Sequence, residues 1–228
     1  MEAELLEEIV EYSVEKWPSV LEAAERMSKL EPFKLLVMTV LSQVTNSRNV
    51  RTAYQRLEEA VGVEPVKLAS ARLEVVEEAL KPAGLWRGRA RSIVLLAREV
   101  VERYGGSLDP LARLPTGELR KRLMQLPRVG PKTADVVLLF SYGRRVMPVD
   151  THISRIVRRL GLVGSNRYEE LRRVVEEGVR GDMAVAHLAL IAFGRNVCRP
   201  RKPRCSECPV ANRCPSSTTR TAHPSALR

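Results

Sequence analysis

The chain has 228 residues, enough for one large domain or for two small lobes with separate hydrophobic cores. It contains no run of about 18 apolar residues, which excludes a membrane-spanning helix, and its 4% aromatic content argues against a stacking platform for single strands. The net charge of +11 and the isoelectric point near 10 favour an anionic partner, with nucleic acid the first candidate.

Apolar residues recur at helical spacing along most of the chain, and Pro and Gly separate the segments. The expected helices are Glu4–Glu15, Val20–Met27, Pro32–Gln43, Val50–Val61, Ala71–Lys81, Arg87–Tyr104, Thr116–Gln125, Pro131–Tyr142, Thr151–Leu160, Tyr168–Val179 and Asp182–Phe193. The first is strongly acidic and is expected to face away from a polyanion. No alternating run is long enough for a sheet, so we expect an all-α protein. The tail 215–228 is expected to be disordered.

A short segment between two expected helices, residues 126–130, has the composition of a tight hairpin. Pro131 suits the first position of a helix, and Gly130 permits close approach of a ligand to the backbone. Such a hairpin can seat a phosphate, although many helix–turn–helix connections bind nothing. Lys132, in the first helical turn, has two interpretations. It is either a solvated or phosphate-binding lysine, or an amine nucleophile that attacks a sugar carbon and forms a Schiff base.

Asp150 directly precedes an apolar-periodic helix and is predicted to cap its N-terminus. Capping keeps a carboxylate ionised and rigid, which a charge-stabilising or proton-accepting catalytic group requires. His152, in the first turn of that helix, and His187, on an apolar helix, are expected to be packed residues rather than metal ligands.

All four cysteines lie close to the C-terminus, with the spacing Cys198-x6-Cys205-x2-Cys208-x5-Cys214. The first ten residues lack the form of a signal peptide, so we expect a cytoplasmic protein, and clustered cysteines in a reduced compartment are more often metal ligands than disulfides. Zinc sites usually have two short Cys-x2–4-Cys pairs, and this chain has one. The spacing therefore favours an iron–sulfur cluster and leaves structural zinc open.

Three features follow one another along the chain: a Leu-Pro-x-Val-Gly-x-Lys-Thr-Ala hairpin, a Val-Asp-Thr-His helix start and the four-cysteine loop. Together they closely resemble the endonuclease III branch of the helix–hairpin–helix DNA glycosylases, over roughly residues 30–214. The resemblance implies a DNA repair enzyme that removes damaged bases and carries a [4Fe-4S] cluster. By the same resemblance Lys132 matches the nucleophile and Asp150 the essential carboxylate. The cluster ligands are Cys198, Cys205, Cys208 and Cys214.

The resemblance also implies contacts to DNA. The amides of Val129 and Gly130 would hold the backbone, Gln43 would fill the gap left by an extruded base, and Leu85 would wedge into the stack. As alternatives, Gln43 is a helix C-cap and Leu85 an ordinary buried leucine. Arg128 replaces the family's usual glycine; at positive φ it would cost about 1 kcal/mol, and it could contact a phosphate itself. The cluster loop adds cations that include Arg201, Lys202 and Arg204.

The resemblance favours a bifunctional DNA glycosylase/AP lyase that removes oxidised pyrimidines. Its expected partner is double-stranded DNA containing damaged bases or abasic sites. The bifunctional reaction is favoured because relatives that act on mismatches generally lack a lysine at the position of Lys132. The alternatives are a monofunctional mismatch or uracil DNA glycosylase and a non-catalytic damage-binding module. We expect a monomer with no membrane partner.

The expected architecture is two helical lobes that flank a DNA-binding groove. One is a helical barrel domain over residues 29–144, with the helix–hairpin–helix at about 118–141. The other, the iron–sulfur cluster domain, combines residues 1–28 with 145–214.

Overall fold

The computed structural model describes residues 2–42 and 47–219, and within them every side chain except those of residues 2, 3 and 47. Over this part of the chain the protein is all-helical, with no strand, which confirms the predicted fold class. None of the helices in the described ranges is long and apolar enough to cross a membrane.

The chain divides into two compact units. Residues 27–144, which contain the predicted hairpin, form the hairpin unit. Residues 1–26 and 145–228, which contain the cysteines, form the cysteine unit. The helix α2 (Ser19–Ser28) runs from the cysteine unit into the hairpin unit.

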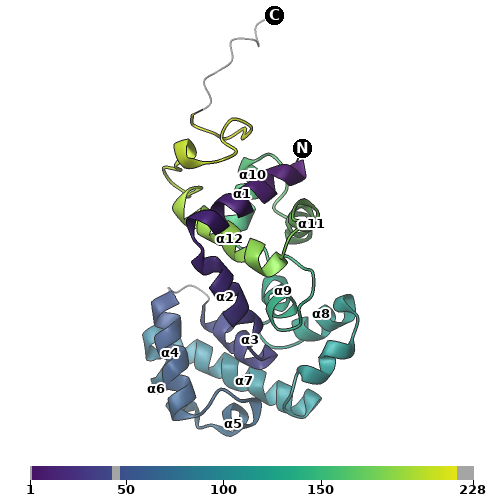
Figure 1. The fold of residues 1–228 in the computed structure, drawn as a ribbon. Coiled ribbons are helices and arrows are strands. Elements are labelled where there is room, and N and C mark those ends of the chain that lie inside the picture. Colours follow the sequence, from purple (N-terminus) through teal and green to yellow (C-terminus); the bar gives the residue numbers. More distant parts are fainter. Residues whose placement is uncertain (1, 43–46, 220–228) are drawn as a thin grey trace, which may run out of the picture. The chain divides into compact units, whose positions relative to one another are not determined.

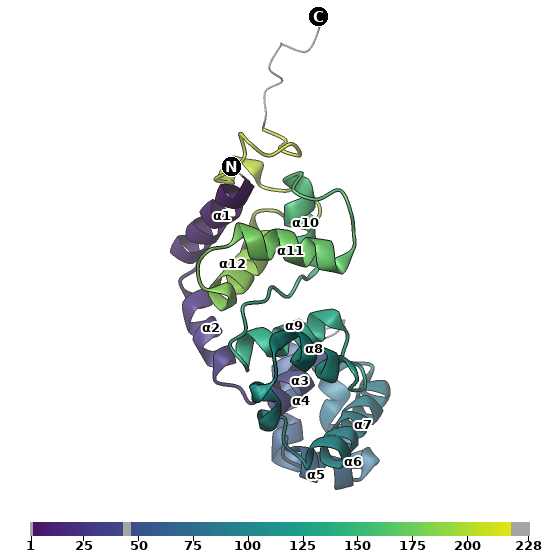
Figure 2. The same cartoon turned by 90° about the vertical axis from the view of Figure 1, so that its right-hand side faces the viewer.

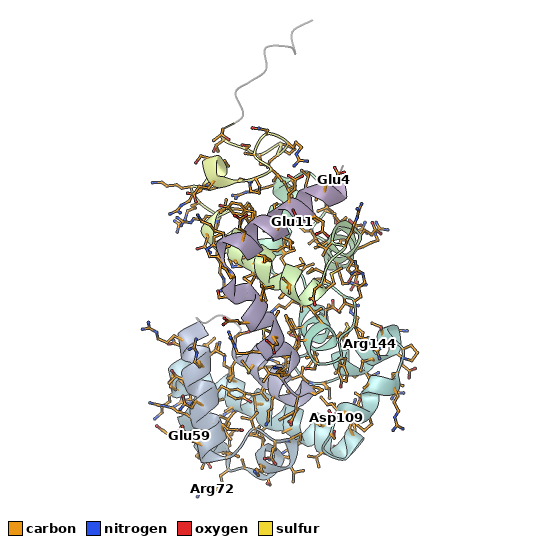
Figure 3. All side chains as sticks on the ribbon, in the orientation of Figure 1. Glu4, Glu11, Glu59, Arg72, Asp109 and Arg144 are labelled. Atoms are coloured by element: carbon orange, nitrogen blue, oxygen red, sulfur yellow. The ribbon has the colours of Figure 1, made fainter. Side chains whose placement is uncertain are left out.

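The hairpin unit is built from seven further α-helices and two 3-10 turns in its described residues. They are α3 (Pro32–Leu41), α4 (Ser47–Ala60), α5 (Pro65–Ser70), α6 (Leu73–Leu80), η1 (Lys81–Ala83), α7 (Trp86–Tyr104), η2 (Asp109–Arg113), α8 (Thr116–Met124) and α9 (Pro131–Phe140). In Figure 1, α3 and α7 lie between α4 and α6 on the left and α8 and α9 on the right. Both α3 and α9 are buried along nearly their whole length and supply much of the core, since α3 packs on α9, α4 and α7. Arg144, labelled in Figure 3, donates hydrogen bonds to the carbonyls of Ala112 (2.7 Å) and Leu114 (3.2 Å) and so ties the end of the unit to η2.

The cysteine unit gathers helices from both ends of the chain, as Figure 2 shows. They are α1 (Glu2–Lys16), α10 (Thr151–Arg159), α11 (Tyr168–Gly178), α12 (Met183–Asn196) and the 3-10 turn η3 (Cys205–Glu207). The buried face of α1 packs on α12 and α11, while its acidic residues Glu4 and Glu11 are exposed (Figure 3). Helices α10 and α12 cross closely at Gly194, where a Cβ atom would lie 2.7 Å from Cβ of His152. Only glycine allows this approach.

The predicted helices are all present, and the differences have local causes. The short α5 was not predicted, because six residues are too few for helical periodicity to show. The helix expected over Ala71–Lys81 begins at Leu73. The helix expected to reach Gln43 ends at Leu41, where the Ser42 hydroxyl donates to the Thr39 carbonyl at 2.8 Å. Gln43 itself lies outside the described residues.

A buried ion pair braces the helix–hairpin–helix. Arg120 on α8 donates through Nε to Oδ1 of Asp135 on α9 at 2.6 Å and through Nη2 to Oδ2 at 3.2 Å. The Asp135 side chain is fully buried, and that of Arg120 is 17% exposed. A two-pronged contact of this kind fixes both the spacing and the rotation of the two helices around the hairpin.

We predict that Arg120→Ala lowers the free energy of unfolding by about 3–5 kcal/mol, because it deprives a buried carboxylate of its charged partner. Urea-induced unfolding measures the change. The matched control is Arg122→Ala on the same helix, whose pair with Glu118 is half exposed and should be worth less than about 1 kcal/mol. Equal effects of the two substitutions would contradict the bracing role.

Candidate functional site

The hairpin consists of the turn that links α8 to α9. Its strained residue is Arg128, which has a φ of +65° and an exposed side chain. A left-handed conformation costs a non-glycine residue roughly 1–2 kcal/mol, so the cost foreseen for arginine at this position is real. Gly130 has a φ of −87°, which any residue adopts, and a Cβ atom there would meet no neighbour among the described residues. The turn does not itself require glycine at 130, whereas close approach of a ligand does.

The hairpin amides differ in their availability. The amide of Val129 donates to the Leu126 carbonyl at 3.2 Å, and its side chain is buried. In this conformation the turn itself uses this donor, and the contact of the Val129 amide with a DNA phosphate stays a prediction. The amide of Gly130 has no acceptor among the described residues and lies at the N-terminus of α9, where the helix dipole favours an anion.

Lys132 is the second residue of α9, and Pro131 occupies the first position, as the sequence predicted. The side chain of Lys132 is partly buried, and the next residue, Thr133, is fully packed. Lys132 thus lies in the first turn of α9, immediately after the hairpin, where the helix dipole is positive.

Asp150, in the cysteine unit, caps the N-terminus of α10. Its Oδ1 accepts from the amides of His152 (2.8 Å) and Ile153 (2.9 Å), which confirms the predicted cap. Its Oδ2 has no hydrogen-bond donor among the described residues. Just before it, the amide of Val149 donates to the Tyr168 hydroxyl at 3.3 Å and anchors the segment on α11. One carboxylate oxygen is thus fixed by the helix while the other stays available for chemistry.

His152 is a packed residue, as expected. Its Nδ1 lies 3.0 Å from Nη2 of Arg155. Burial lowers the pKa of its imidazole, and the charges of Arg155 and Arg195 lower it further, against the opposing effect of Asp150. His152 is therefore neutral at neutral pH and supports the α10–α12 contact rather than carrying a charge.

The four thiols line a single cavity of the cysteine unit, whose apolar wall includes Ile9, Ile156 and Phe193. A guanidinium N–H of Arg159 donates to Sγ of Cys198 at 3.4 Å, and the Cys214 thiol donates to the Arg159 carbonyl at the same distance. A set of four sulfurs in an apolar pocket with an N–H donor to one sulfur is the donor set of an iron–sulfur centre.

The electrostatics of the thiols fit a metal centre. Burial, with a smaller contribution from the other three cysteines, raises the pKa of the Cys208 thiol to about 11, against the opposing effect of a hydrogen bond with the Val210 backbone. Burial likewise raises the pKa of Cys214. Crowded thiols need cationic metal to stay deprotonated together. Within the described residues no three His, Cys, Asp or Glu side chains are grouped as ligands of a single ion, although all four sulfurs line the cavity.

The loop between the first two cysteines is held by α10. Arg159 donates to the carbonyls of Arg199 (2.6 Å) and Pro200 (2.9 Å), and Arg155 donates to the carbonyl of Cys198 at 2.9 Å. The predicted DNA-contacting cations of this loop are all exposed: Arg201, Lys202 and Arg204. Arg204 forms an ion pair with Glu207, with 3.4 Å between Nη1 and Oε1. Arg155 and Arg159 were not predicted as functional residues, although their i, i+4 spacing places them on one face of α10.

Leu85 is not an ordinary buried leucine. It is 70% exposed, has a φ of +48° and stands at the N-cap of α7. Arg89, which is only 6% exposed, donates to the carbonyls of Ala83 and Gly84 and fixes the loop that presents Leu85. An exposed leucine on a braced loop fits a wedge for a base stack. The predicted partner position, Gln43, cannot be placed beside it because it lies outside the described residues.

Comparisons with known proteins agree with this geometry. A family model described as "HhH-GPD superfamily base excision DNA repair protein" matches residues 37–180, and one described as "Iron-sulfur binding domain of endonuclease III" matches residues 198–214. The chain is 34% identical to endonuclease III of Thermotoga maritima over 214 residues, which cover 92% of each chain. It is 34% identical to endonuclease III of Sulfolobus acidocaldarius over 185 residues, 80% of this chain and 81% of the relative.

Among solved structures, a trapped covalent intermediate of endonuclease III with DNA has a TM-score of 0.71 and 28% identity, covering 88% of this chain and 96% of that chain. A thermostable thymine-DNA glycosylase has a TM-score of 0.77 and covers 95% of this chain and 96% of that chain; at 22% identity it shows the fold alone. The second family match begins at Cys198 and ends at Cys214, and the predicted [4Fe-4S] cluster is thereby confirmed.

We predict that Asp150→Ala lowers the free energy of unfolding by about 1 kcal/mol, whereas Asp150→Asn changes it by a few tenths, because asparagine caps a helix as well as aspartate does. The matched control is Asp182, which caps α12 through the amides of Ala184 and Val185. Its Ala and Asn variants should show the same pattern in urea-induced unfolding. A loss of stability in Asp150→Asn as large as in Asp150→Ala would mean that the charge, and not the cap, stabilises the fold.

Proposed function

Since the chain belongs to the endonuclease III family of the HhH-GPD superfamily of base excision DNA repair proteins, we propose that it removes oxidised pyrimidines from double-stranded DNA through Lys132 and Asp150. The reaction class follows from the family: the protein is a bifunctional DNA glycosylase with AP lyase activity. The lesion class and the residue roles are our proposal. The observation that supports them most strongly is a lysine in the first turn of the helix after the hairpin.

The reaction begins with extrusion of the damaged nucleotide, because the sugar carbon C1′ cannot be reached inside a stacked duplex. Lesions that stack or pair poorly flip at lower cost, which contributes to selection. The exposed Leu85 wedges into the base stack, and the amide of Gly130 binds a backbone phosphate. These contacts position the nucleotide without reading its sequence.

Lys132 then acts as the nucleophile. Its neutral amine bonds to C1′, the C1′–N bond to the base breaks, and the base leaves with that electron pair and takes up a proton. Loss of the amine's protons and opening of the sugar ring give an imine between Nζ and C1′. Removal of a C2′ proton then expels the 3′ phosphate and cleaves the strand.

Asp150 stabilises the positive charge that develops on the sugar. Its Oδ1 is occupied by the cap, so the second oxygen, Oδ2, faces the reacting group or accepts its proton. Because the cap fixes the carboxylate before the substrate arrives, little reorganisation is needed during the reaction.

The cysteine loop contributes to binding. Its four thiolates would ligate the [4Fe-4S] cluster, which on this proposal shapes the loop and takes no part in bond breaking. The exposed cations Arg201 and Lys202 add salt-sensitive affinity for phosphates. We further propose that the protein acts as a monomer, because the hairpin, the lysine, the carboxylate and the cluster loop all belong to one chain.

We predict that borohydride traps a covalent protein–DNA adduct on a duplex that contains thymine glycol, and that Lys132→Ala abolishes it, because only an imine is reduced to a stable bond. Denaturing gel electrophoresis measures the adduct. Lys121→Ala, an exposed lysine on α8, is the control and should retain full trapping. Release of free base with an intact abasic strand would instead assign a monofunctional glycosylase and reduce Lys132 to a phosphate contact.

A second prediction separates charge from structure at Asp150. Asp150→Asn should lower the single-turnover rate of base removal by about 10²-fold or more, since the helix cap survives and the negative charge does not. DNA affinity should stay within a few-fold of the parent protein. Asp182→Asn makes the same chemical change at the start of α12 and should leave the rate unchanged. An active Asp150→Asn enzyme would remove Asp150 from the mechanism.

A further inference from the structure

The hairpin unit contains a second cavity, of about 420 Å³, between two segments that are distant in sequence. One wall is the loop that starts α7, and the other is the hairpin that precedes α9. The lining residues are Val40, Leu85, Trp86, Arg87, Gly88, Arg89, Ser92 and Arg128. The cavity thus joins the predicted wedge to the predicted phosphate-binding turn.

Two arginines of this cavity have no anionic partner in the described part of the chain. Arg87 and Arg128 are both exposed, and no hydrogen bond or ion pair links either to a described carboxylate. The guanidinium of Arg87 lies 5.6 Å from the centre of the Trp86 ring. No acidic residue lines the cavity, so its cationic character is not neutralised from within.

The backbone of Arg128 indicates that this residue serves a ligand. At a φ of +65°, glycine would form the same turn without strain. The exposed guanidinium makes no contact in the described residues that would offset the strain. A planar guanidinium with a fork of N–H donors matches a phosphate. Binding a phosphate would therefore offset the backbone strain at Arg128, which no contact within the described residues offsets.

The opposite wall is rigid. Buried Arg89 binds the carbonyls of Ala83 and Gly84 and thereby fixes the loop. Leu85 follows in the left-handed conformation and begins the 19-residue helix α7, so Arg87 lies in its first turn. A cation held at the positive end of a helix is unfavourable by itself, and this disadvantage is relieved when an anion binds there.

We propose that Arg87 and Arg128 form a binding site for a DNA backbone phosphate in this cavity, in addition to the contact made by the Gly130 amide. The inference rests on the proposed function, because it takes duplex DNA as the ligand. A phosphate is favoured over a base edge because both guanidinium groups are exposed and no hydrogen bond with a described residue fixes the orientation of either, whereas base reading requires a fixed two-pronged geometry.

The test compares Arg128→Gly, Arg87→Ala and the parent protein in binding to a duplex with a non-cleavable abasic-site analogue, by fluorescence anisotropy across a salt series. Each substitution should weaken binding by about threefold to tenfold. Each should also lower the slope of log K against log salt by about 0.9. The control is Arg103→Ala, which removes one positive charge near the C-terminal end of α7, where Arg103 pairs with Glu99. It should leave both quantities close to those of the parent.

Arg128→Gly also separates binding from folding. It should unfold at the same or a higher temperature than the parent, since glycine relieves the positive φ. Unchanged affinity and salt slope would overturn the proposal, as would a lower unfolding temperature, which would assign Arg128 to the fold. A loss of affinity confined to duplexes with guanine at one position would also overturn it in favour of base reading. The Lys132 mechanism is tested by borohydride trapping in the parent protein and in Lys132→Ala, without either arginine variant, so failure of this site and failure of that mechanism are distinguishable.

Discussion

The amide hydrogens in the first turn of an α-helix have no acceptor within their own helix, and the site depends on how this chain uses them. At α10, Asp150 accepts two of these hydrogens and becomes a fixed carboxylate. At α9, Gly130 and Pro131 leave the turn open to an anion, and Lys132 follows them in the first helical turn. One helix start is thus closed by a carboxylate, and the other is left open.

Buried and partly buried arginines carry out much of the remaining positioning. Arg120 locks α8 to α9 below the hairpin, Arg89 fixes the loop before α7, and Arg155 and Arg159 fix the cysteine loop to α10. Arg89, Arg155 and Arg159 bind carbonyls of loop segments, whereas Arg120 binds a carboxylate on a helix. Because one arginine satisfies several acceptors at once, a few side chains hold these loops without strands or disulfides.

Hydrophobic periodicity was enough to predict the fold class and the long helices, because a helix with one buried face has apolar residues at every third or fourth position of its sequence. The cap at Asp150 and the start of α9 at Pro131 were likewise predictable from local chemistry. The left-handed backbone of Leu85 and the capture of the Val129 amide by Leu126 were not, since both depend on how a turn closes. Tertiary contacts such as Arg159 with the carbonyls of Arg199 and Pro200 leave no local signal beyond a spacing on one helix face.

The discontinuous cysteine unit has a consequence for synthesis of the protein. Ile9 and Cys214 line the same cavity although they are far apart in the sequence, so one wall is synthesised well before the other. The hairpin unit is a continuous stretch and can fold while the ribosome is still at work, whereas α1 must wait with its apolar face exposed until α12 and the cysteines emerge. The four-cysteine site is therefore complete only after Cys214 has been synthesised, and a chain that stops before this residue leaves the cavity lined by Ile9 without one of its four sulfurs.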